Sequence, residues 1–382
     1  MMEPEGKTSR ITGGVDTHKD THTAAALDAT GRVLGNATFP ASAVGYEELL
    51  AWLRRFGPLD RVGVEGTGSY GAGLMRYLRE SEVPVIDVNR PNRQARRQHG
   101  KSDPADAEAA ARATLSGDAS GVPKSQDGTV EVIRILRLER RSAIQARTQA
   151  ANQLHAVVST APEPLRTKLR ALSLAALLDH ARKCRDVLPT DTVSATQRVL
   201  RGLTARWQHL DREVDQLDAQ LAALVKTAAP DLVALRGVGI DVAGALLVAA
   251  GDNPERLAHE ASFAALCGVS PVDASSGRQR RHRLNRGGNR DANRALWVVA
   301  LVRMQRDPRT RAYVLRRTGQ GLGKREILRC LKRYIAREVF KLLRASSVVA
   351  GDGETRLELV ACQNIGASTR WPSRSSRPAS SR

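Results

Sequence analysis

Residues 11–39 read ITGGVDTHKDTHTAAALDATGRVLGNATF, and this stretch decides the fold of the first third of the chain. Apolar and polar residues alternate in Ile11–Asp16, Thr23–Leu27 and Val33–Phe39, as they do in half-buried strands. The intervening Asp28–Gly31 is typical of a tight turn between antiparallel strands. The sequence therefore predicts that the chain opens with an antiparallel meander.

Helices and strands alternate after this meander. Apolar residues at helical spacing between Tyr46 and Leu53 predict a helix, and Arg61–Glu65 reads as a short buried strand. A helix over 69–80, a strand at Pro84–Val88 and a helix from Asp103 to Ala113 complete the series. The order is that of the ribonuclease H-like fold, whose mixed sheet presents carboxylates at strand ends. We therefore expect an α/β domain of this type.

The middle of the chain is predicted to form long helices. Residues 116–129 are rich in Gly, Ser and Asp and read as a linker, which bounds a first domain at 11–125 and a second at 126–228. The partner of the helix expected at 196–227 is either the helix at 130–158, folded back as an antiparallel coiled coil, or the same helix in a second subunit. The heptad seam of this helix consists of Leu200, Leu203, Trp207, Leu210, Val214, Leu217, Leu221 and Leu224.

The third domain, 229–345, is also expected to be helical. Between two apolar helices, residues 235–240 read LRGVGI, which resembles the turn of a helix-hairpin-helix motif. In that motif Gly237 and Gly239 would let backbone N–H groups approach a DNA phosphate. A plain tight turn explains the two glycines equally well.

Positive charge is concentrated near the end of the chain. The formal net charge is +20, and residues 278–344 carry 21 Lys or Arg against four acidic residues, largely on helices expected at 289–306 and 323–344. Such a patch favours nucleic acid through counterion release, although a basic surface that only maintains solubility is the alternative. Aromatic residues make up 3% of the chain, so contacts to phosphate should dominate over base stacking. The candidate DNA contacts among the arginines are Arg278, Arg280, Arg281, Arg283, Arg286 and Arg290.

Cysteine usage and hydropathy predict the compartment. Cys184, Cys267, Cys330 and Cys362 are far apart in the sequence and form no close pair of the kind that binds zinc. No long uncharged apolar run is present, so we expect no membrane association. We expect a cytoplasmic, nucleoid-associated protein, and the Ser-, Arg- and Pro-rich segment 364–382 is predicted to be disordered.

Four carboxylates are expected to converge in the first domain. Asp16 and Glu65 each end a predicted strand, and Asp103 and Asp106 are three residues apart at a helix start, so that both lie on one face. Several hard carboxylate oxygens converging on one point are what divalent cations of the Mg²⁺ type require. The structural alternative is that Asp103, before Pro104, caps the helix, and that Asp106 is favoured there by the helix dipole.

Two histidines offer a competing metal site. His18 and His22 are four residues apart, which would suggest a zinc-binding pair if they lay on a helix. They fall instead in a strand and its bend, a placement that does not bring both to one face.

A serine in the last domain is a candidate nucleophile. Ser275 and Ser276 precede Gly277 in a predicted flexible loop, and adjacent arginines could stabilise charge on a phosphate that a serine attacks. Such Ser-Ser-Gly loops are also commonly only turns.

Three motifs together resemble the DEDD signature of the insertion-sequence 110 family of transposases. They are GVDTHKDTH at 14–22, VEGTG at 64–68 and KSDPADA at 101–107. The stretch from Leu235 to Trp297, with its GVSP and SSG segments, is similar to the C-terminal transposase domain of that family. The resemblance covers nearly all of residues 11–345, with its motifs in the family's order.

The resemblance implies a recombinase with a composite active site. RuvC-type carboxylates, matching Asp16, Glu65, Asp103 and Asp106, would bind Mg²⁺, and a serine would attack the scissile phosphate to give a covalent phosphoserine. Position by position Ser276 matches that serine, with Ser275 as the second choice. Family members act as multimers, so a homodimer or homotetramer is implied. A structured RNA encoded by the element would pair with donor and target DNA.

Three rival functions share some of these features. An actin-like or sugar-kinase ATPase would explain the first hairpin, but a later Asp- and Gly-rich adenosine segment is missing from the sequence. A metal-dependent Holliday-junction-type nuclease would use activated water in place of the serine. A non-catalytic DNA-binding protein would use the basic helices alone.

Overall fold

The computed structural model describes residues 10–88, 102–185, 188–277 and 282–350. The chain begins with a five-stranded mixed sheet of order β3-β2-β1-β4-β5. β2 is antiparallel to β1 and β3, whereas β4 is parallel to both β1 and β5. The predicted meander and the α/β character of this region are therefore confirmed. The strands are β1 (Ile11–Thr17), β2 (Thr21–Leu27), β3 (Val33–Pro40), β4 (Leu59–Glu65) and β5 (Val85–Val88).

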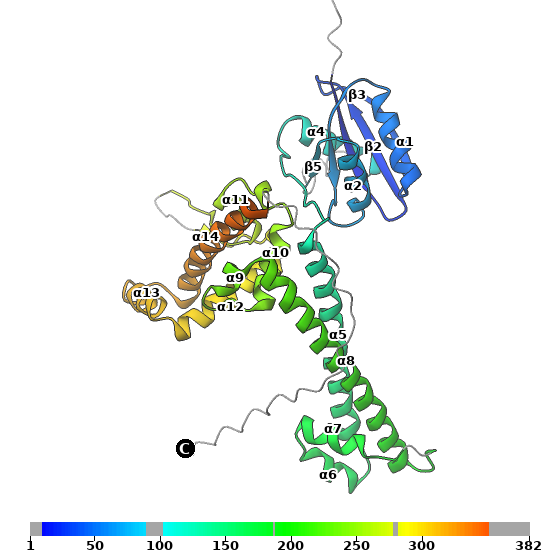
Figure 1. Ribbon diagram of the computed structural model, residues 1–382, viewed down its shortest axis with the longest axis vertical. Helices are drawn as coiled ribbons and strands as arrows, with labels where there is room; N and C mark the ends of the chain where they lie inside the picture. The colour runs from blue at the N-terminus through cyan, green and yellow to red at the C-terminus, as the bar shows by residue number, and fades with distance from the viewer. Residues whose placement is uncertain (1–9, 89–101, 186–187, 278–281, 351–382) are drawn as a thin grey trace, which may run out of the picture.

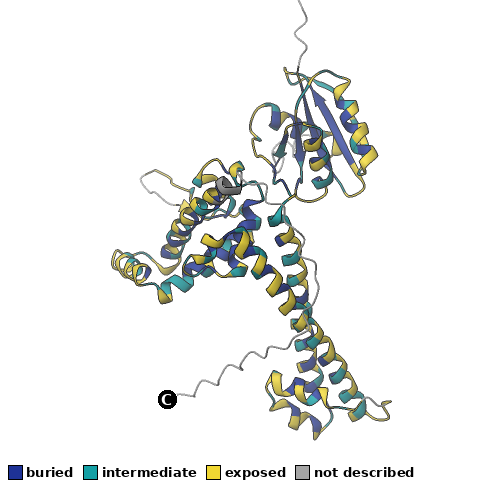
Figure 2. Ribbon diagram, viewed as in Figure 1, coloured by how far each residue is buried: buried dark blue, intermediate teal, exposed yellow. Residues whose placement is uncertain are grey.

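Helices cover both faces of this sheet (Figure 1). α1 (Ala43–Arg54) and α2 (Ala72–Glu80) pack their leucines against one face, in a core shared with Ile11 and Val15. α4 (Asp103–Leu115) lies on the other face, across β1, β2 and β4. Figure 2 shows the strands buried between these layers.

A long antiparallel helical pair projects away from the sheet (Figure 1). It consists of α5 (Thr129–Ser159) and α8 (Thr192–Ala228). The short helices α6 (Leu165–Arg170) and α7 (Leu174–Arg182) pack at its far end. Because α8 packs along α5 of the same chain, the partner left open by the sequence is the intrachain helix. The seam residues of α8 that are buried are Leu200, Val214, Leu217 and Leu221.

Ion pairs fix the register of this coiled coil. Arg140 pairs with Asp218, and the Arg147 guanidinium lies 2.5 Å from an Asp211 carboxylate oxygen. The two pairs are one heptad apart on both helices and run in opposite directions, which is the antiparallel arrangement.

The rest of the described chain forms a helical body beside the coil (Figure 1). Its elements are α9 (Pro230–Ala234), α10 (Ile240–Ala250), η1 (Pro254–Arg256), α11 (Glu260–Leu266), β6 (Val272–Asp273), β7 (His282–Arg283), α12 (Arg290–Arg306), α13 (Pro308–Gly319) and α14 (Lys324–Ala350). α10, α12 and α14 supply most of its core, around the fully buried Phe263. The sequence predicted the two long basic helices and the apolar helices on either side of the glycine turn, but it did not predict α11 or α13. The segment 364–382 lies outside the described residues.

The predicted linker is hydrogen-bonded to the sheet domain. We call residues 121–128 the brace. The backbone N–H of Asp87 donates to the Gly121 carbonyl at 2.7 Å, and the Gln126 side-chain amide donates to the Thr67 carbonyl at 3.0 Å. Gln126 itself adopts a positive φ of 57°, a costly conformation for a residue other than glycine.

The brace is also bound to the C-terminal body. Asn253 accepts from the Ser125 backbone N–H and donates to the Pro123 carbonyl, both at 3.0 Å. The Asp252 carboxylate accepts the first backbone N–H groups of α5, from Val130 at 2.6 Å and Glu131 at 3.1 Å. The segment between sheet and helices is therefore a two-sided connection, which composition alone did not reveal.

Lys124 lies within the brace, and its ammonium donates to the Val248 carbonyl at 2.5 Å. Burial, aided by the charge of Arg256, lowers the pKa of Lys124 from 10.5 to about 8. Between these two pKa values the unfolded chain binds the additional proton, so the contribution of Lys124 to the free energy of unfolding rises with pH.

We predict that wild-type protein gains stability relative to Lys124→Met as the pH is raised from 8 to 10.5. The gain should be on the order of 1.4 kcal/mol for each unit of pKa difference. Denaturant unfolding of both proteins across this range measures it, and a constant difference between them would contradict the prediction.

Candidate functional site

Two parallel strands present their acidic ends at one edge of the sheet. Val15 of β1 pairs with Val64 of β4, so the next residues, Asp16 and Glu65, stand side by side. The Thr17 hydroxyl donates to the Glu65 carbonyl at 2.7 Å and links the two strand ends. Asp16 is only 7% exposed, and a carboxylate so buried requires compensating partners.

α4 brings two further carboxylates to this edge. Its N-cap is Ser102, whose hydroxyl accepts from the Ala105 backbone N–H. Asp103 therefore does not cap the helix, contrary to the structural alternative that the sequence left open. Its side chain is half exposed, whereas Asp106, on the same face, is buried.

Glycines on both central strands let α4 approach this closely. A Cβ on Gly14 would lie 2.2 Å from the Ala111 backbone nitrogen, and one on Gly63 would lie 2.0 Å from the Thr114 hydroxyl oxygen. Because side chains alternate along a strand, Gly14 and Asp16 face the same side, toward α4. The backbone contact at Gly14 thus sets the distance between Asp16 and the acidic start of α4.

His18 joins these carboxylates. Its Nδ1 lies 3.8 Å from an Asp16 carboxylate oxygen and 3.8 Å from an Asp103 carboxylate oxygen. The three ligand atoms all lie within 4.8 Å of one another. Among the described residues, Glu65 and Asp106 are neighbours of this group but do not belong to it.

The two histidines that the sequence paired have separate environments. The His22 ring is buried and stacks on Tyr46, with centroids 5.6 Å apart. Burial lowers the pKa of His22, and its Nδ1 lies 3.0 Å from the Thr21 carbonyl oxygen. His18 alone adjoins the acidic cluster. The missed signal was the spacing of two between Asp16 and His18, which places both side chains on one face of an extended strand.

We predict that Gly14→Ala displaces α4 and weakens divalent-cation binding at Asp16 and Asp103. The overpacking should also cost about 1–3 kcal/mol or more in the free energy of unfolding. Calorimetric titration with Mn²⁺ and denaturant unfolding measure the two effects.

Gly13→Ala is the matched control, because its Cβ would meet only side-chain atoms of Leu53 and Val62, the nearest at 3.1 Å. Equal losses of cation affinity in the two variants would contradict the role assigned to the α4 contact.

The candidate serines lie on the C-terminal body. Ser275 and Ser276 follow β6 and are exposed. The Ser275 backbone N–H donates to an Asp273 carboxylate oxygen at 2.8 Å, and the hydrogen bond from the Ser275 hydroxyl is the main cause that lowers the pKa of Asp273. Ser275 is therefore held in a local turn, and Ser276 follows it directly, before Gly277 at a positive φ of 55°.

A groove of about 490 Å³ lies beside this loop. Arg283 and Arg286 are two of its lining residues, together with Val272, Leu284 and Asn285. Arg290, at the start of α12, is exposed. Arg278, Arg280 and Arg281 lie outside the described residues.

The glycine turn separates α9 from α10. Gly237 adopts a positive φ of 85° and packs against α12, since its Cβ would lie 3.4 Å from the Val299 carbonyl oxygen. Gly239 is exposed and is the N-cap of α10, where a Cβ would meet nothing within 4 Å. The positive φ of Gly237 is thus a backbone reason for glycine at this position, whereas Gly239 leaves a helix N-terminus open to solvent.

Basic side chains cover much of the surface of α12, α13 and α14. Part of this charge is neutralised within the body, because Arg303 pairs with Glu338 at 2.7 Å and Arg236 pairs with Asp307 at 3.1 Å. Exposed basic residues of these helices are Arg290, Arg294, Arg306, Arg309, Arg311, Arg316, Lys324, Arg325, Arg329, Arg337, Lys341 and Arg344.

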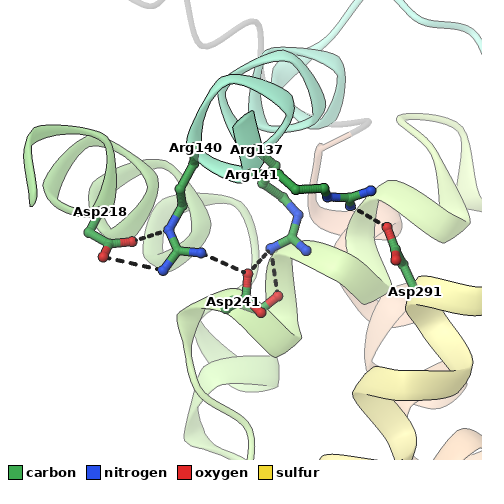
Figure 3. A network of polar contacts seen from close by, with 6 residues as sticks. All are labelled: Arg137, Arg140, Arg141, Asp218, Asp241 and Asp291. Carbon is green, nitrogen blue, oxygen red and sulfur yellow. Dashed lines mark hydrogen bonds and ion pairs between the residues drawn. The ribbon is translucent and has the colours of Figure 1, made fainter. Parts of the chain in front are cut away.

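An arginine cluster on α5 holds the C-terminal body against the coil (Figure 3). Arg137 donates to the Asp241 carboxylate at 2.6 Å and to its backbone carbonyl at 2.7 Å. Arg141 pairs with Asp291, at the start of α12. Arg140 donates hydrogen bonds to Asp218 of α8 and forms an ion pair with Asp241 at 3.7 Å. The acidic edge of the sheet and the serine loop therefore belong to two bodies connected through α5 and the brace (Figure 1).

Comparison with known proteins defines the class. A family model of DEDD type, described as a transposase, matches residues 13–161, and a model described as the transposase IS116/IS110/IS902 family matches residues 230–315. The first match contains all four predicted carboxylates and the second contains the serine loop. The chain belongs to the IS110 family of transposases.

One curated relative is the "Insertion element IS110 uncharacterized 43.6 kDa protein" of Streptomyces coelicolor. It is 33% identical over 150 residues, which are 38% of this chain and 36% of the relative. The match thus spans about a third of the length of that protein. Among the described helices, none has the length and apolar character needed to cross a bilayer.

Proposed function

We propose that this protein is a DNA transposase that cleaves and exchanges strands, with a ribonuclease H-like (RuvC-type) domain at 11–125. A coiled coil at 126–228 and a DNA-binding domain at 229–345 would complete it. The observation that carries the proposal is the convergence of Asp16 and Asp103 at one sheet edge, in a chain whose family models cover both this edge and the serine loop. The strand order β3-β2-β1-β4-β5 supports the ribonuclease H-like assignment.

The residues at the acidic edge fit a divalent cation. Asp16 and Asp103 offer hard carboxylate oxygens close together, while Glu65 and Asp106 stand beside them. In the proposed function the four carboxylates hold Mg²⁺. When bound, such a cation polarises a phosphoryl oxygen and stabilises the charge that develops there.

Ser276 is the proposed nucleophile. Its hydroxyl oxygen would form an ester bond to the scissile phosphorus, while the bond from phosphorus to one bridging sugar oxygen breaks. The serine proton balances the sugar oxygen, which leaves as a hydroxyl. Arg283 and Arg286, which line the neighbouring groove, would bind the nonbridging oxygens. The contact between Ser275 and Asp273 supports Ser276 as the reactive residue of the two.

The proposed partners of this protein are DNA, an RNA and further copies of the same chain. DNA backbones would lie on the basic helices, with Gly239 at an open helix N-terminus. As the family resemblance implies, an element-encoded RNA would supply sequence recognition through base pairing. This division fits a chain with 3% aromatic residues, which offers little base stacking. Joining two DNA molecules would employ a homodimer or homotetramer.

We predict that Ser276→Ala abolishes strand exchange and the covalent protein–DNA adduct. The loss should be about 100-fold or more, because the bond-forming atom is removed. Ser275→Ala, the matched control, should retain the adduct. Denaturing gel electrophoresis with labelled DNA detects the adduct, and metal-dependent cleavage that persists without it in both variants would favour the junction nuclease.

The salt dependence of DNA binding should report the basic helices. The double variant Arg290→Gln/Arg294→Gln should have a less steep fall of log affinity with log salt concentration. The magnitude of this negative slope should decrease by about 1 for each phosphate that the variant no longer neutralises. Arg182→Gln removes one charge from the far end of the coil and should leave the slope unchanged. Fluorescence anisotropy with duplex DNA measures these slopes, and equal slopes in all proteins would place the DNA elsewhere.

A further inference from the structure

We propose that His18 is a third protein ligand of the cation held by Asp16 and Asp103, and that its imidazole makes this site bind Mn²⁺ in preference to Mg²⁺. The inference rests on the proposed function, because it assumes that the acidic edge binds a divalent cation. It adds a residue outside the four carboxylates and a selectivity that those carboxylates do not imply.

The position of the His18 ring supports ligation through Nδ1. This atom is 3.8 Å from one oxygen of Asp16 and 3.8 Å from one oxygen of Asp103. Protein ligands bound at about 2.1 Å to one ion lie roughly 3 to 4 Å apart, so small side-chain adjustments would complete the site. The three residues come from the end of β1, the turn after it and the start of α4.

The local backbone fixes where the histidine stands. The His18 N–H donates to the Thr21 carbonyl at 3.0 Å, which closes the turn between β1 and β2. Asp16 is held within the sheet, and α4 is seated on Gly14. The His18 side chain remains 43% exposed, so a hydrated ion can reach it from solvent. The donor atoms are therefore positioned by rigid elements and are open on one side.

The donor chemistry decides the selectivity. Mg²⁺ prefers oxygen ligands and gives up its hydration water reluctantly, whereas first-row transition ions accept an imidazole nitrogen more readily than Mg²⁺ does. Two carboxylates alone would accept Mg²⁺ and Mn²⁺ alike. Adding one imidazole nitrogen should favour Mn²⁺, because Mn²⁺ accepts both donor types.

The direct test is the spectrum of bound Mn²⁺. Electron spin-echo modulation of the full-length protein loaded with Mn²⁺ should show a directly coordinated nitrogen. That signal should disappear in His18→Ala and remain in His209→Ala, which removes an exposed histidine from α8. An unchanged nitrogen signal in His18→Ala, or its absence in the wild type, would overturn the proposal.

Calorimetric titration supplies the second readout. His18→Ala should weaken Mn²⁺ binding about tenfold or more, and Mg²⁺ binding by a smaller factor. His18→Asn, which offers an amide oxygen in place of the nitrogen, should shift the preference toward Mg²⁺. If each substitution changes the affinity for Mn²⁺ and the affinity for Mg²⁺ by the same factor, His18 has a purely electrostatic role. The proposed preference for Mn²⁺ would then be wrong.

Asp16→Asn separates failure of this inference from failure of the proposed function. If Asp16→Asn abolishes Mn²⁺ binding while His18→Ala leaves it intact, the acidic site stands and His18 is not a ligand. If neither substitution changes Mn²⁺ binding, the cation site of the proposed function falls as well. Circular dichroism of each variant verifies that the fold persists.

Discussion

The close packing of α4 on two glycines is the constraint on which the acidic site depends. A side chain at Gly14 or Gly63 would overlap atoms of α4, so only glycine lets the helix lie directly on β1 and β4. This packing gains dispersion energy over the length of the helix, and it also sets the height of the helix above the sheet. Asp103 can reach Asp16 only because that height is small. Gly14 and Gly63 thus determine both the packing of α4 on the sheet and the arrangement of the acidic side chains.

The connection between the two halves of the chain depends on polar contacts of a different kind. On the brace, the Asn253 side chain bonds backbone groups of Ser125 and Pro123, and the Gln126 side-chain amide donates to the Thr67 carbonyl. These bonds satisfy backbone groups that would otherwise be buried without partners. Along α5, arginines bond aspartates from three other helices. The brace therefore links the loop after Glu65 to the segment after α10 through hydrogen bonds. These bonds constrain the position of the sheet relative to the C-terminal helical body.

Local patterns predicted much of this fold. Alternation gave the meander, the heptad seam gave α8, and strand ends gave Asp16 and Glu65, because each signal lies within a few residues. Contacts between distant segments were not predictable in the same way. Asn253 and Gln126 look like ordinary loop residues in the sequence. Their role arises only where distant residues meet, 130 positions apart for Asn253 and Pro123 and 59 positions apart for Gln126 and Thr67. His18 was within reach of the alternation rule, but its pairing with His22 drew the prediction elsewhere.

The ion pairs along α5 and the hydrogen bonds of the brace should respond differently to added salt. Arg141 and Asp291 are each about half exposed, and such pairs contribute about 0–1 kcal/mol and are screened by added ions. The hydrogen bonds that Asn253 and Gln126 make with the brace and the sheet join neutral amides and carbonyls, for which ionic screening is weak. In the proposed function, DNA binding to the basic face of α12 to α14 depends on charge alone. DNA would therefore dissociate from this face at salt concentrations at which the hydrogen bonds of the brace are still formed. Weak DNA binding at high salt would then reflect screening between arginine and phosphate, with the acidic site and its cation still in place.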